Sequence, residues 1–319
     1  MSRINVLRLR DRTGRPADAS SAGRPVRSPN SDTAADGYEI VPLRHPLKWV
    51  GALVVLVLLA MLVHSLATNS LFEWHVVWRY LFDTRILDGL GRTLLLTVIA
   101  MIIGVALGMV LAIMRSVESW MLSAVAAVYI WFFRGTPLLV QLIFWYNFAA
   151  LYQHVSLGLP FGPSFWSAET NSLIDPWTAA LLGLGLNQAA YTAEIIRGGI
   201  LSVGRGQREA GLALGMHAGQ VFWRITLPQA MKVVIPPIGN EVISMLKGTS
   251  LVSVIALTEL LYSAQLIYSQ SYQTIPLLIV ISIWYLAATS VLSVGQYFIE
   301  RRFSREFRTQ RIMARVAQP

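Results

Sequence analysis

RGQREAGLALGMHAGQVFWRITLP, residues 205–228, is the stretch that most strongly constrains how this chain folds. It contains Glu209-Ala210-Gly211, then Gly215, and closes on Leu227-Pro228 in the pattern E-A-G-x3-G-x9-I-x-L-P. The stretch lies in a polar gap, residues 197–232, between two strongly apolar segments. A polar gap of this length predicts a segment that stays in water while its neighbours cross a bilayer.

The composition supports a membrane protein. Hydrophobic residues make up 55% of the 319 residues and charged residues only 13%, against roughly 25% charged in soluble domains. The chain has no cysteine, which excludes disulfides and thiolate metal sites. Its net charge of +9 is concentrated in the tails and at the ends of apolar runs, a distribution typical of membrane proteins and not of nucleic-acid binding. We therefore expect an all-α integral membrane protein.

Apolar runs predict about six transmembrane helices. Residues 1–46 are rich in Arg, Ser, Pro, Asp and Gly and are predicted to be a disordered tail without signal-peptide character. Residues 47–88 are expected to hold an extra N-terminal span and an external segment. The expected spans are 49–67, 90–114, 137–152, 176–196, a kinked 233–267 with a short external helix, and 275–298. Residues 120–133 are expected to form a tilted or interfacial helix, and residues 153–175 an external loop.

Lys and Arg near the span ends predict the orientation. Nine of them lie in or next to the first tail and six follow residue 300, whereas the loop 153–175 has none. Both termini and the gap 197–232 are therefore expected to be cytoplasmic, in a bacterial inner membrane. Arg79 and Arg85 in the expected external segment do not fit this rule.

Several short motifs occur in an order that resembles the permeases of polar amino acid importers, the histidine/glutamine-type family of ATP-binding-cassette (ABC) transporters. The motifs are Gly89-x3-Thr93-Leu94, Phe133-Arg134-Gly135-Thr136-Pro137 with Gln141, Ala190-Tyr191-Thr192-Ala193-Glu194, the 209–228 pattern, Pro236-Pro237-x-Gly239-Asn240-Glu241, Lys247-x-Thr249-Ser250 and Glu259-Leu260. The resemblance covers residues 89–300 and leaves out the first span.

This resemblance implies a type I importer transmembrane domain, MetI-like, over residues 89–300, followed by a basic cytoplasmic tail at 301–319. It implies an EAA loop, residues 198–232, that docks into a separate cytoplasmic ATPase subunit. It also implies an extracytoplasmic amino-acid-binding protein and a second permease chain, identical or a sister. The sequence has no G-x-x-x-x-G-K-[ST] motif, so ATP and Mg are expected on the partner, with no cofactor, metal or nucleic acid bound here.

Within the EAA loop, the docking residues implied by the family pattern are Glu209, Ala210, Gly211, Gly215, Leu227 and Pro228. Glu209 is expected early in a helix, where a carboxylate favours the N-terminal dipole. Ala210, Gly211 and Ala213 are expected to form a thin face that fits a groove on the partner. Gly215 is expected to end the helix in a left-handed conformation, and Leu227-Pro228 to turn the chain toward the membrane.

Polar residues at membrane depth are candidates for the translocation pathway: Asn187, Gln188, Tyr191, Glu194, Glu241, Lys247, Thr249 and Ser250. Such groups usually face a cavity or a partner. Helix–helix hydrogen bonds compete with a pathway role for Asn187 and Tyr191. For Glu194 we favour a local ion pair with Arg197, and for Lys247 a structural pairing with Glu241 or Glu194 over a substrate carboxylate. Arg134 is interpreted as an interfacial anchor, with a gate contact to Glu259 or to the loop as the alternative.

Two other classes of function remain as alternatives. A secondary transporter or channel would predict internal inverted repeats, and the two halves of the chain do not resemble each other. An intramembrane enzyme would need clustered catalytic groups, but the five histidines, at positions 45, 64, 75, 154 and 217, lie outside the middle of the spans. A permease of the same type that carries a related small zwitterion stays open.

Overall fold

The computed structural model describes residues 46–117, 119–159 and 164–316. The tail predicted at 1–46 therefore lies, apart from its last residue, outside the described part of the chain, and so do 317–319 of the basic tail. The chain divides into two compact units, residues 1–70 and 71–319. In the first unit, α1 (Pro46–Thr68) is a 23-residue helix that is apolar all round. Its length of about 35 Å is sufficient for the expected first span.

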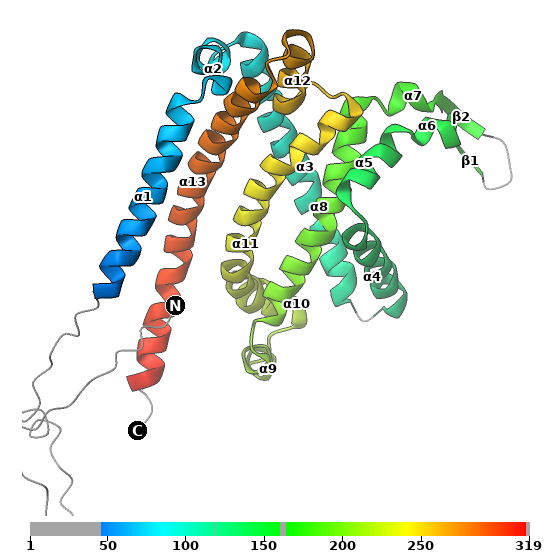
Figure 1. The fold of residues 1–319 in the computed structure, drawn as a ribbon. Helices are drawn as coiled ribbons and strands as arrows, with labels where there is room; N and C mark the ends of the chain where they lie inside the picture. The colour runs from blue at the N-terminus through cyan, green and yellow to red at the C-terminus, as the bar shows by residue number, and fades with distance from the viewer. Residues whose placement is uncertain (1–45, 118, 160–163, 317–319) are drawn as a thin grey trace, which may run out of the picture. The chain divides into compact units, whose positions relative to one another are not determined.

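The second unit is mainly helical (Figure 1). Its elements after η1 (Ser70–Phe72) are α2 (Trp74–Leu81), α3 (Thr84–Ser116), α4 (Trp120–Gly135), α5 (Leu138–Tyr146), α6 (Phe148–Leu151), β1 (His154–Gly158), β2 (Ser164–Glu169), α7 (Thr170–Leu173), α8 (Pro176–Leu201), α9 (Arg205–Ala213), α10 (Ala218–Val221), the π-helical turn η2 (Phe222–Thr226), α11 (Leu227–Gly248), the 3-10 turn η3 (Thr249–Ile255), α12 (Leu260–Ser271) and α13 (Thr274–Val316).

Helices α3 and α8 form the centre of this unit. Gly104 and Gly108 of α3 face Gln188 and Thr192 of α8 so closely that a Cβ on Gly108 would lie 2.6 Å from the Thr192 Cβ. The sequence pair of small residues therefore serves close helix packing, as expected. The adjoining apolar core includes Leu96 and Ala100 of α3, Leu142 of α5 and Leu184 of α8, all fully buried.

Length and composition identify three of the described helices as able to cross a membrane: α1, α3 and the first 30 residues of α13. Two bent pairs, α4 with α5 and the run 218–255 with α12, raise the number to five if each is one span. Helix α8 has the length of a span, at 26 residues, but Asn187, Gln188, Glu194 and Arg197 lower its hydropathy. The number six therefore stays a prediction.

The third span expected at 137–152 is wrong as a single crossing. Helix α5 has nine residues, about 14 Å, too short for a core of about 30 Å. It meets α4 at an angle of 100°. Pro137 caps α5 without donating a hydrogen bond, and the residue before a proline is pushed out of the helical region. The two helices therefore form a sharp bend, and the tilted or interfacial position expected for 120–133 stays a prediction.

The structure locates the interruption in the fifth expected span. Pro236 and Pro237 lie inside α11, which continues to Gly248. The interruption follows at η3, where Ala256 adopts a left-handed conformation with φ 57°, and α12 departs at 45°. A bent helical run followed by a short helix is thus present, as expected; that the run crosses the membrane and that α12 lies on its external side stay predictions.

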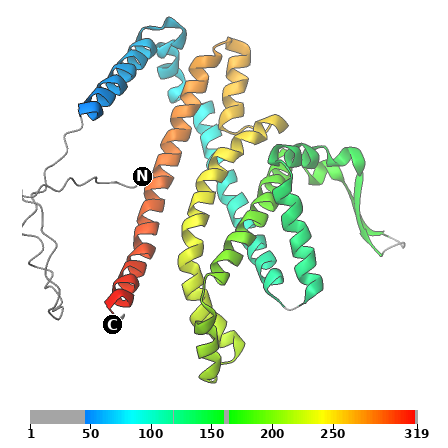
Figure 2. The same cartoon turned by 60° about the horizontal axis from the view of Figure 1, so that its bottom comes forward.

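The segment 153–175, expected as a plain loop, contains an antiparallel hairpin of β1 and β2 followed by α7. The hairpin projects from the helices in Figure 2. The unit is thus all-helical apart from two short strands. Figure 1 shows α9 and α10 at one end of this unit and α12 at the other.

Candidate functional site

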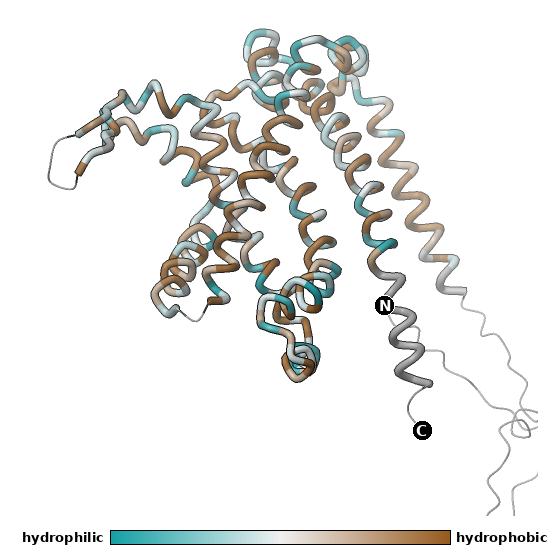
Figure 3. The backbone as a smooth tube through the Cα atoms, turned by 180° about the vertical axis from the view of Figure 1, so that it is seen from behind, coloured by the Kyte–Doolittle hydropathy of each residue, from teal (hydrophilic) through white to brown (hydrophobic). Residues whose placement is uncertain are grey.

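The EAA loop forms a compact helical projection. In α9, Glu209 is the fifth of nine residues, and the first turn contains no acidic residue. The expected stabilisation of Glu209 by the helix N-terminus is therefore wrong, since this effect fades beyond the first turn. Glu209 and Ala210 are both exposed. Figure 3 shows hydrophilic segments gathered around this loop, whereas the long helices are mainly hydrophobic.

Gly211 faces inward and not toward a partner. It is buried, and a Cβ built on it would lie 2.8 Å from Cδ1 of Ile225 and 3.0 Å from Cγ2 of Val221. The thin side of α9 thus packs on α10 and η2 of the same chain. This corrects the expectation that Gly211 contributes to a face for docking, because the missing side chain is needed within the loop itself.

Gly215 ends α9 as predicted, with φ +79°. The Gly215 N–H donates to the Leu212 carbonyl at 3.0 Å, and the Met216 N–H donates to the Gly211 carbonyl at 3.1 Å. These two bonds form a Schellman motif, which satisfies carbonyls at the helix end. The reversal of the chain therefore lies at 215–217.

Leu227-Pro228 does not turn the chain. Residues 218–248 are a continuous helical run from α10 through η2 into α11. The Leu227 N–H donates to the Phe222 carbonyl, five residues back. Pro228 has no N–H for the usual bond four residues back, and a π-helical turn next to it absorbs the irregularity. The proline adjusts the helix geometry at the membrane side of the loop.

Large apolar side chains are exposed on the same projection. Leu214 is 82% exposed and Trp223 is 68% exposed, and Leu212 also faces solvent. Together with exposed Glu209, they make a surface that combines large apolar side chains with a charged one. Exposed apolar patches of this kind commonly mark protein interfaces.

The Arg134-Gly135-Thr136-Pro137 motif lies at the bend between α4 and α5. Asn187 of α8 donates to the Phe133 carbonyl at 2.8 Å, and Gln141 donates to the same carbonyl at 3.0 Å and to Oγ1 of Thr136 at 2.7 Å. These bonds fasten the bend to α8. Asn187 thus has the helix–helix role that was the alternative to a pathway role, and Gln141, a residue of the family motif, ties the bend together.

Each of the remaining candidates on α8 contacts another side chain. Gln188, 4% exposed, donates to Glu241 of α11 at 3.3 Å. The Arg134 guanidinium lies 5.3 Å from the Tyr191 ring centre. Glu194 and Arg197 form the expected local ion pair at 2.8 Å. The structure therefore joins Gln188 with Glu241 and Tyr191 with Arg134.

Lys247 does not behave as the sequence suggested. It is exposed on α11 and makes no ion pair with any described residue, so the predicted pairing with Glu241 or Glu194 is wrong. Its neighbours Thr249 and Ser250 donate to the carbonyls of Leu246 and Lys247 on their own helix, at 2.7 Å each. The break at 249–255 turns these hydroxyls toward the backbone.

A buried polar cluster around Glu259 was only partly foreseen. Its carboxylate, fully buried, accepts from the backbone N–H groups of Leu261 and Tyr262 and from the Tyr285 hydroxyl at 3.0 Å. Thr93 of α3 donates to the same carboxylate at 3.4 Å. The cluster joins α3, α12 and α13, and Arg134 takes no part in it, which excludes the gate contact considered above. Tyr285 lies in no motif, so no sequence signal pointed to it.

No group of three or more metal-ligating side chains occurs among the residues that the structure describes. The arrangement of long apolar helices, a polar seam between them and a projecting loop defines a membrane-embedded transport subunit.

Comparison with known proteins gives the family. The chain belongs to the family described as binding-protein-dependent transport system inner membrane component, whose model matches residues 104–305. It is therefore the transmembrane permease subunit of a binding-protein-dependent importer of the inner membrane, with the MetI-like fold, and the ATPase of this family is a separate chain.

Three similar proteins illustrate the relationship. The arginine transport system permease protein ArgU of Corynebacterium glutamicum is 44% identical, over 88% of this chain and 87% of that protein. The glutamine transport system permease protein GlnP of Escherichia coli K12 is 34% identical, over 74% of this chain and 98% of that protein. The crystal structure of an amino acid ABC transporter with histidines matches with TM-score 0.60 and 36% identity, over 69% of this chain and 95% of that one.

Proposed function

We propose that this chain is the permease of an importer that carries a polar amino acid inward. An extracytoplasmic binding protein delivers the substrate, and a cytoplasmic ATPase docks on the EAA loop and drives alternating access. The observation that carries this proposal is the projecting α9, which exposes Glu209 and Ala210 beside Leu214 and Trp223. A rigid helix that is tied down at Gly211 and Gly215 can transmit the motion of a partner into α8 and α11.

The orientation and composition of the complex belong to this proposal. Both termini and the EAA loop lie in the cytoplasm, and two permease chains, identical or related, form the pathway. The tail 1–46 and the extra span and external segment 47–88 precede the permease domain 89–300, and the basic tail 301–319 follows it. ATP and Mg act on the ATPase alone.

The substrate class follows from the relatives. Those described above are named for arginine and for glutamine, and another, 39% identical over 66% of this chain, for nopaline. Arginine is the first substrate to test here. Uptake into proteoliposomes that contain the complete set of subunits, with arginine, glutamine and a small zwitterion such as a betaine in competition, would separate these possibilities.

We assign the pathway to the faces of α8 and α11 that hold Gln188, Tyr191, Glu241 and Lys247. Gln188 and Glu241 meet between the two helices, and Lys247 presents a cation that pairs with no carboxylate of the described residues. Asn187, Glu194, Thr249 and Ser250 contribute to the same seam through structural bonds.

Charge reversal on α9 tests the docking role. We expect Glu209→Lys to insert into the membrane normally and to lose ATPase copurification or ATP-driven uptake, because a cation replaces the exposed carboxylate of the contact. Glu169→Lys, the same change at an exposed position of the hairpin, should keep both. Normal uptake by Glu209→Lys would refute the docking role. Absence of any ATPase after gentle extraction of wild-type protein would favour a secondary transporter or channel.

A further inference from the structure

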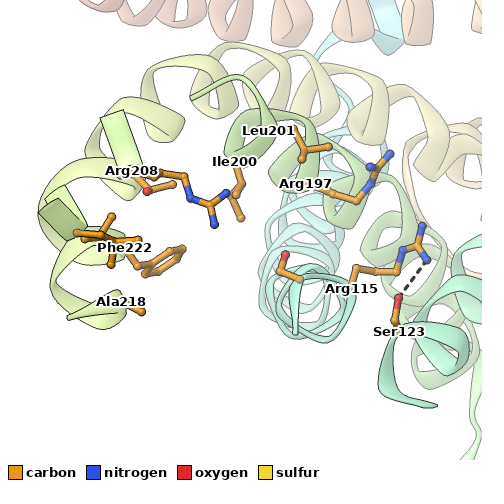
Figure 4. A pocket seen from close by; sticks show the side chains of 12 residues that line it. Arg115, Ser123, Arg197, Ile200, Leu201, Arg208, Ala218 and Phe222 are labelled. Carbon is orange, nitrogen blue, oxygen red and sulfur yellow. Dashed lines mark hydrogen bonds between the residues drawn. The ribbon is translucent and has the colours of Figure 1, made fainter. Parts of the chain in front are cut away.

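A cavity of about 540 Å³ lies between the EAA loop and the ends of three helices. One wall consists of the end of α3, the start of α4 and the end of α8, and the other consists of α9, α10 and η2. Arg115, Arg197 and Arg208 line it, and none of its lining residues is acidic. In Figure 4, Arg208 extends from the loop toward Ile200, while Arg115 and Arg197 lie on the helix side.

The arginines have unused hydrogen-bonding capacity. Arg115 lies in the last turn of α3, and one of its Nη atoms donates to Ser123 at 3.4 Å. Its Nε is buried and finds no acceptor among the described residues. A buried donor without a partner is costly, and most such groups in folded proteins are satisfied. Among the described residues, the Arg115 Nε is therefore a buried donor that is left for an acceptor in the cavity.

The charge of the cavity is also unbalanced. Glu194 pairs with Arg197 at 2.8 Å and also attracts Arg115 over a longer distance, but Arg115 and Arg208 form no ion pair with any described residue. Ser123 lies in the first turn of α4, whose helix dipole directs positive potential toward this end. Two unpaired guanidinium groups and a helix N-terminus on one cavity favour a ligand with at least one full negative charge.

The other half of the cavity is apolar. Ile200, Leu201, Leu212 and Phe222 line it, and Leu201 is 66% exposed. Trp120, 82% exposed at the start of α4, is of the residue type that marks the membrane–water interface. The α3 span ends one residue after Arg115. The lining is thus amphipathic and lies next to the end of an apolar helix, as a site near the lipid headgroups requires.

We propose that this cavity is a phosphate-binding site in which Arg115 and Arg208 hold a phosphate group from opposite walls. Guanidinium groups bind phosphate with paired, charge-assisted hydrogen bonds, and basic pockets between membrane helices accept anionic lipid headgroups. The phosphate is supplied by an anionic phospholipid or by a free phosphate ion. Because the ligand contacts both α3 and α9, its binding fixes the EAA loop against the helix ends.

The test uses the full-length protein in a neutral detergent at constant ionic strength. Binding of short-chain phosphatidylglycerol, short-chain phosphatidylcholine and inorganic phosphate is followed by the shift in unfolding temperature and by native mass spectrometry. Arg115→Gln and Arg208→Gln are compared with Arg224→Gln, which removes an exposed arginine of the same loop outside the cavity. We expect saturable binding that each cavity variant weakens roughly tenfold or more, with the control unchanged.

The three probes distinguish a lipid headgroup from a free phosphate ion as the source of the phosphate. Binding of phosphatidylglycerol without inorganic phosphate identifies a lipid headgroup, and the reverse identifies a free ion; either supports the site. Equal loss in all three variants would mean general surface electrostatics and would overturn the proposal, as would the absence of saturable binding to any probe. If Arg115→Gln fails to fold, exposed Arg208 alone decides the result.

Discussion

Hydrogen bonds and ion pairs of individual side chains separate the polar groups with a structural role from those that remain available to a substrate. The side-chain amides of Asn187 and Gln141 both donate hydrogen bonds to the Phe133 carbonyl at the bend. Gln188 reaches Glu241, and Glu194 is neutralised by Arg197. Lys247, by contrast, has no carboxylate among the described residues. At the residue scale, the polar positions thus differ in what remains free to meet a substrate.

Lys247 offers the sharpest residue-scale prediction for transport. We expect Lys247→Gln to lower ATP-driven uptake at least tenfold at normal expression, because a cation beside the pathway is removed and no internal ion pair is broken. Lys247→Arg should retain more uptake. Arg301→Gln, which removes an exposed cation beyond the permease domain, is the control. Unchanged KM and kcat in Lys247→Gln would remove this residue from the pathway.

Asp175 gives a pH-dependent contribution to stability. Its carboxylate caps α8 by accepting the Thr178 N–H at 2.8 Å, and this bond to the ionised form lowers the pKa of Asp175. The folded pKa is below the unfolded one, so the stabilisation is complete above the unfolded value, about 3.9, and is lost as the pH falls through the folded pKa.

We therefore expect Asp175→Ala to cost about 1 kcal/mol at pH 7, measured as the shift in unfolding temperature in detergent. The difference from wild type should shrink below about pH 4. Asp175→Asn can keep the cap without titrating, so its difference from Ala should not vary with pH. A gap between wild type and Ala that stays constant down to pH 3 would show that the cap contributes through packing alone.

At the scale of elements, local chemistry explains the helix ends well and the breaks poorly. Asp83, Ser119 and Asp175 cap α3, α4 and α8, and Gly215 ends α9. Yet Pro236 and Pro237 lie inside α11 without ending it. The bend between α4 and α5 has a local cause, since Pro137 keeps Thr136 out of the helical region, and Asn187 of α8 fastens it. No local pattern revealed the left-handed Ala256 that follows the 3-10 turn at 249–255.

The end of α9 provides a matched pair of glycine variants. Neither Gly206 nor Gly215 would bring a new Cβ into contact with another atom, but only Gly215 has a positive φ. We expect Gly215→Ala to destabilise the loop by about 1 kcal/mol or more and to weaken ATPase copurification. Gly206→Ala, inside the helix, should stabilise α9 slightly. Hydrogen exchange of residues 205–216 measures both, and equal protection in the two variants would contradict the left-handed cap.

At the scale of the unit 71–319, the close approach of α3 and α8 organises everything else. The surfaces of Gly104 and Gly108 set the distance between the two helices. That contact places Gln188 within hydrogen-bond distance of Glu241, and Asn187 next to the bend between α4 and α5. The amphipathic cavity with Arg115 and Arg208 forms where these same helices end beside the EAA loop.

The packing of α3 on α8 can be tested directly. A Cβ at Gly108 would lie 2.9 Å from the Ala189 carbonyl oxygen as well as close to Thr192. We expect Gly108→Ala to destabilise the protein by about 1–3 kcal/mol and to reduce uptake by separating the helices. Gly91→Ala on the same helix meets no atom within 4 Å and should keep its unfolding temperature. Equal behaviour of the two variants would show that α3 and α8 do not depend on this contact.

The amino-acid sequence by itself determined the membrane class, most of the long helices, the left-handed end of α9 and the ion pair of Glu194 with Arg197. These features depend on composition, on hydrophobic run length and on residues a few positions apart. Motif order also indicated the family that the comparisons then confirmed.

Only the tertiary structure decided that Gly211 faces inward, that Leu227-Pro228 continues a helix, and that Arg115 and Arg208 line one cavity. It also showed that Lys247 pairs with no carboxylate in the described part of the chain. Each depends on residues far apart in the chain meeting across a helix contact. The physical reason is that helical periodicity determines which residues lie on the same face of a helix. The side-chain volume at contacts such as Gly108 determines which other element packs against that face.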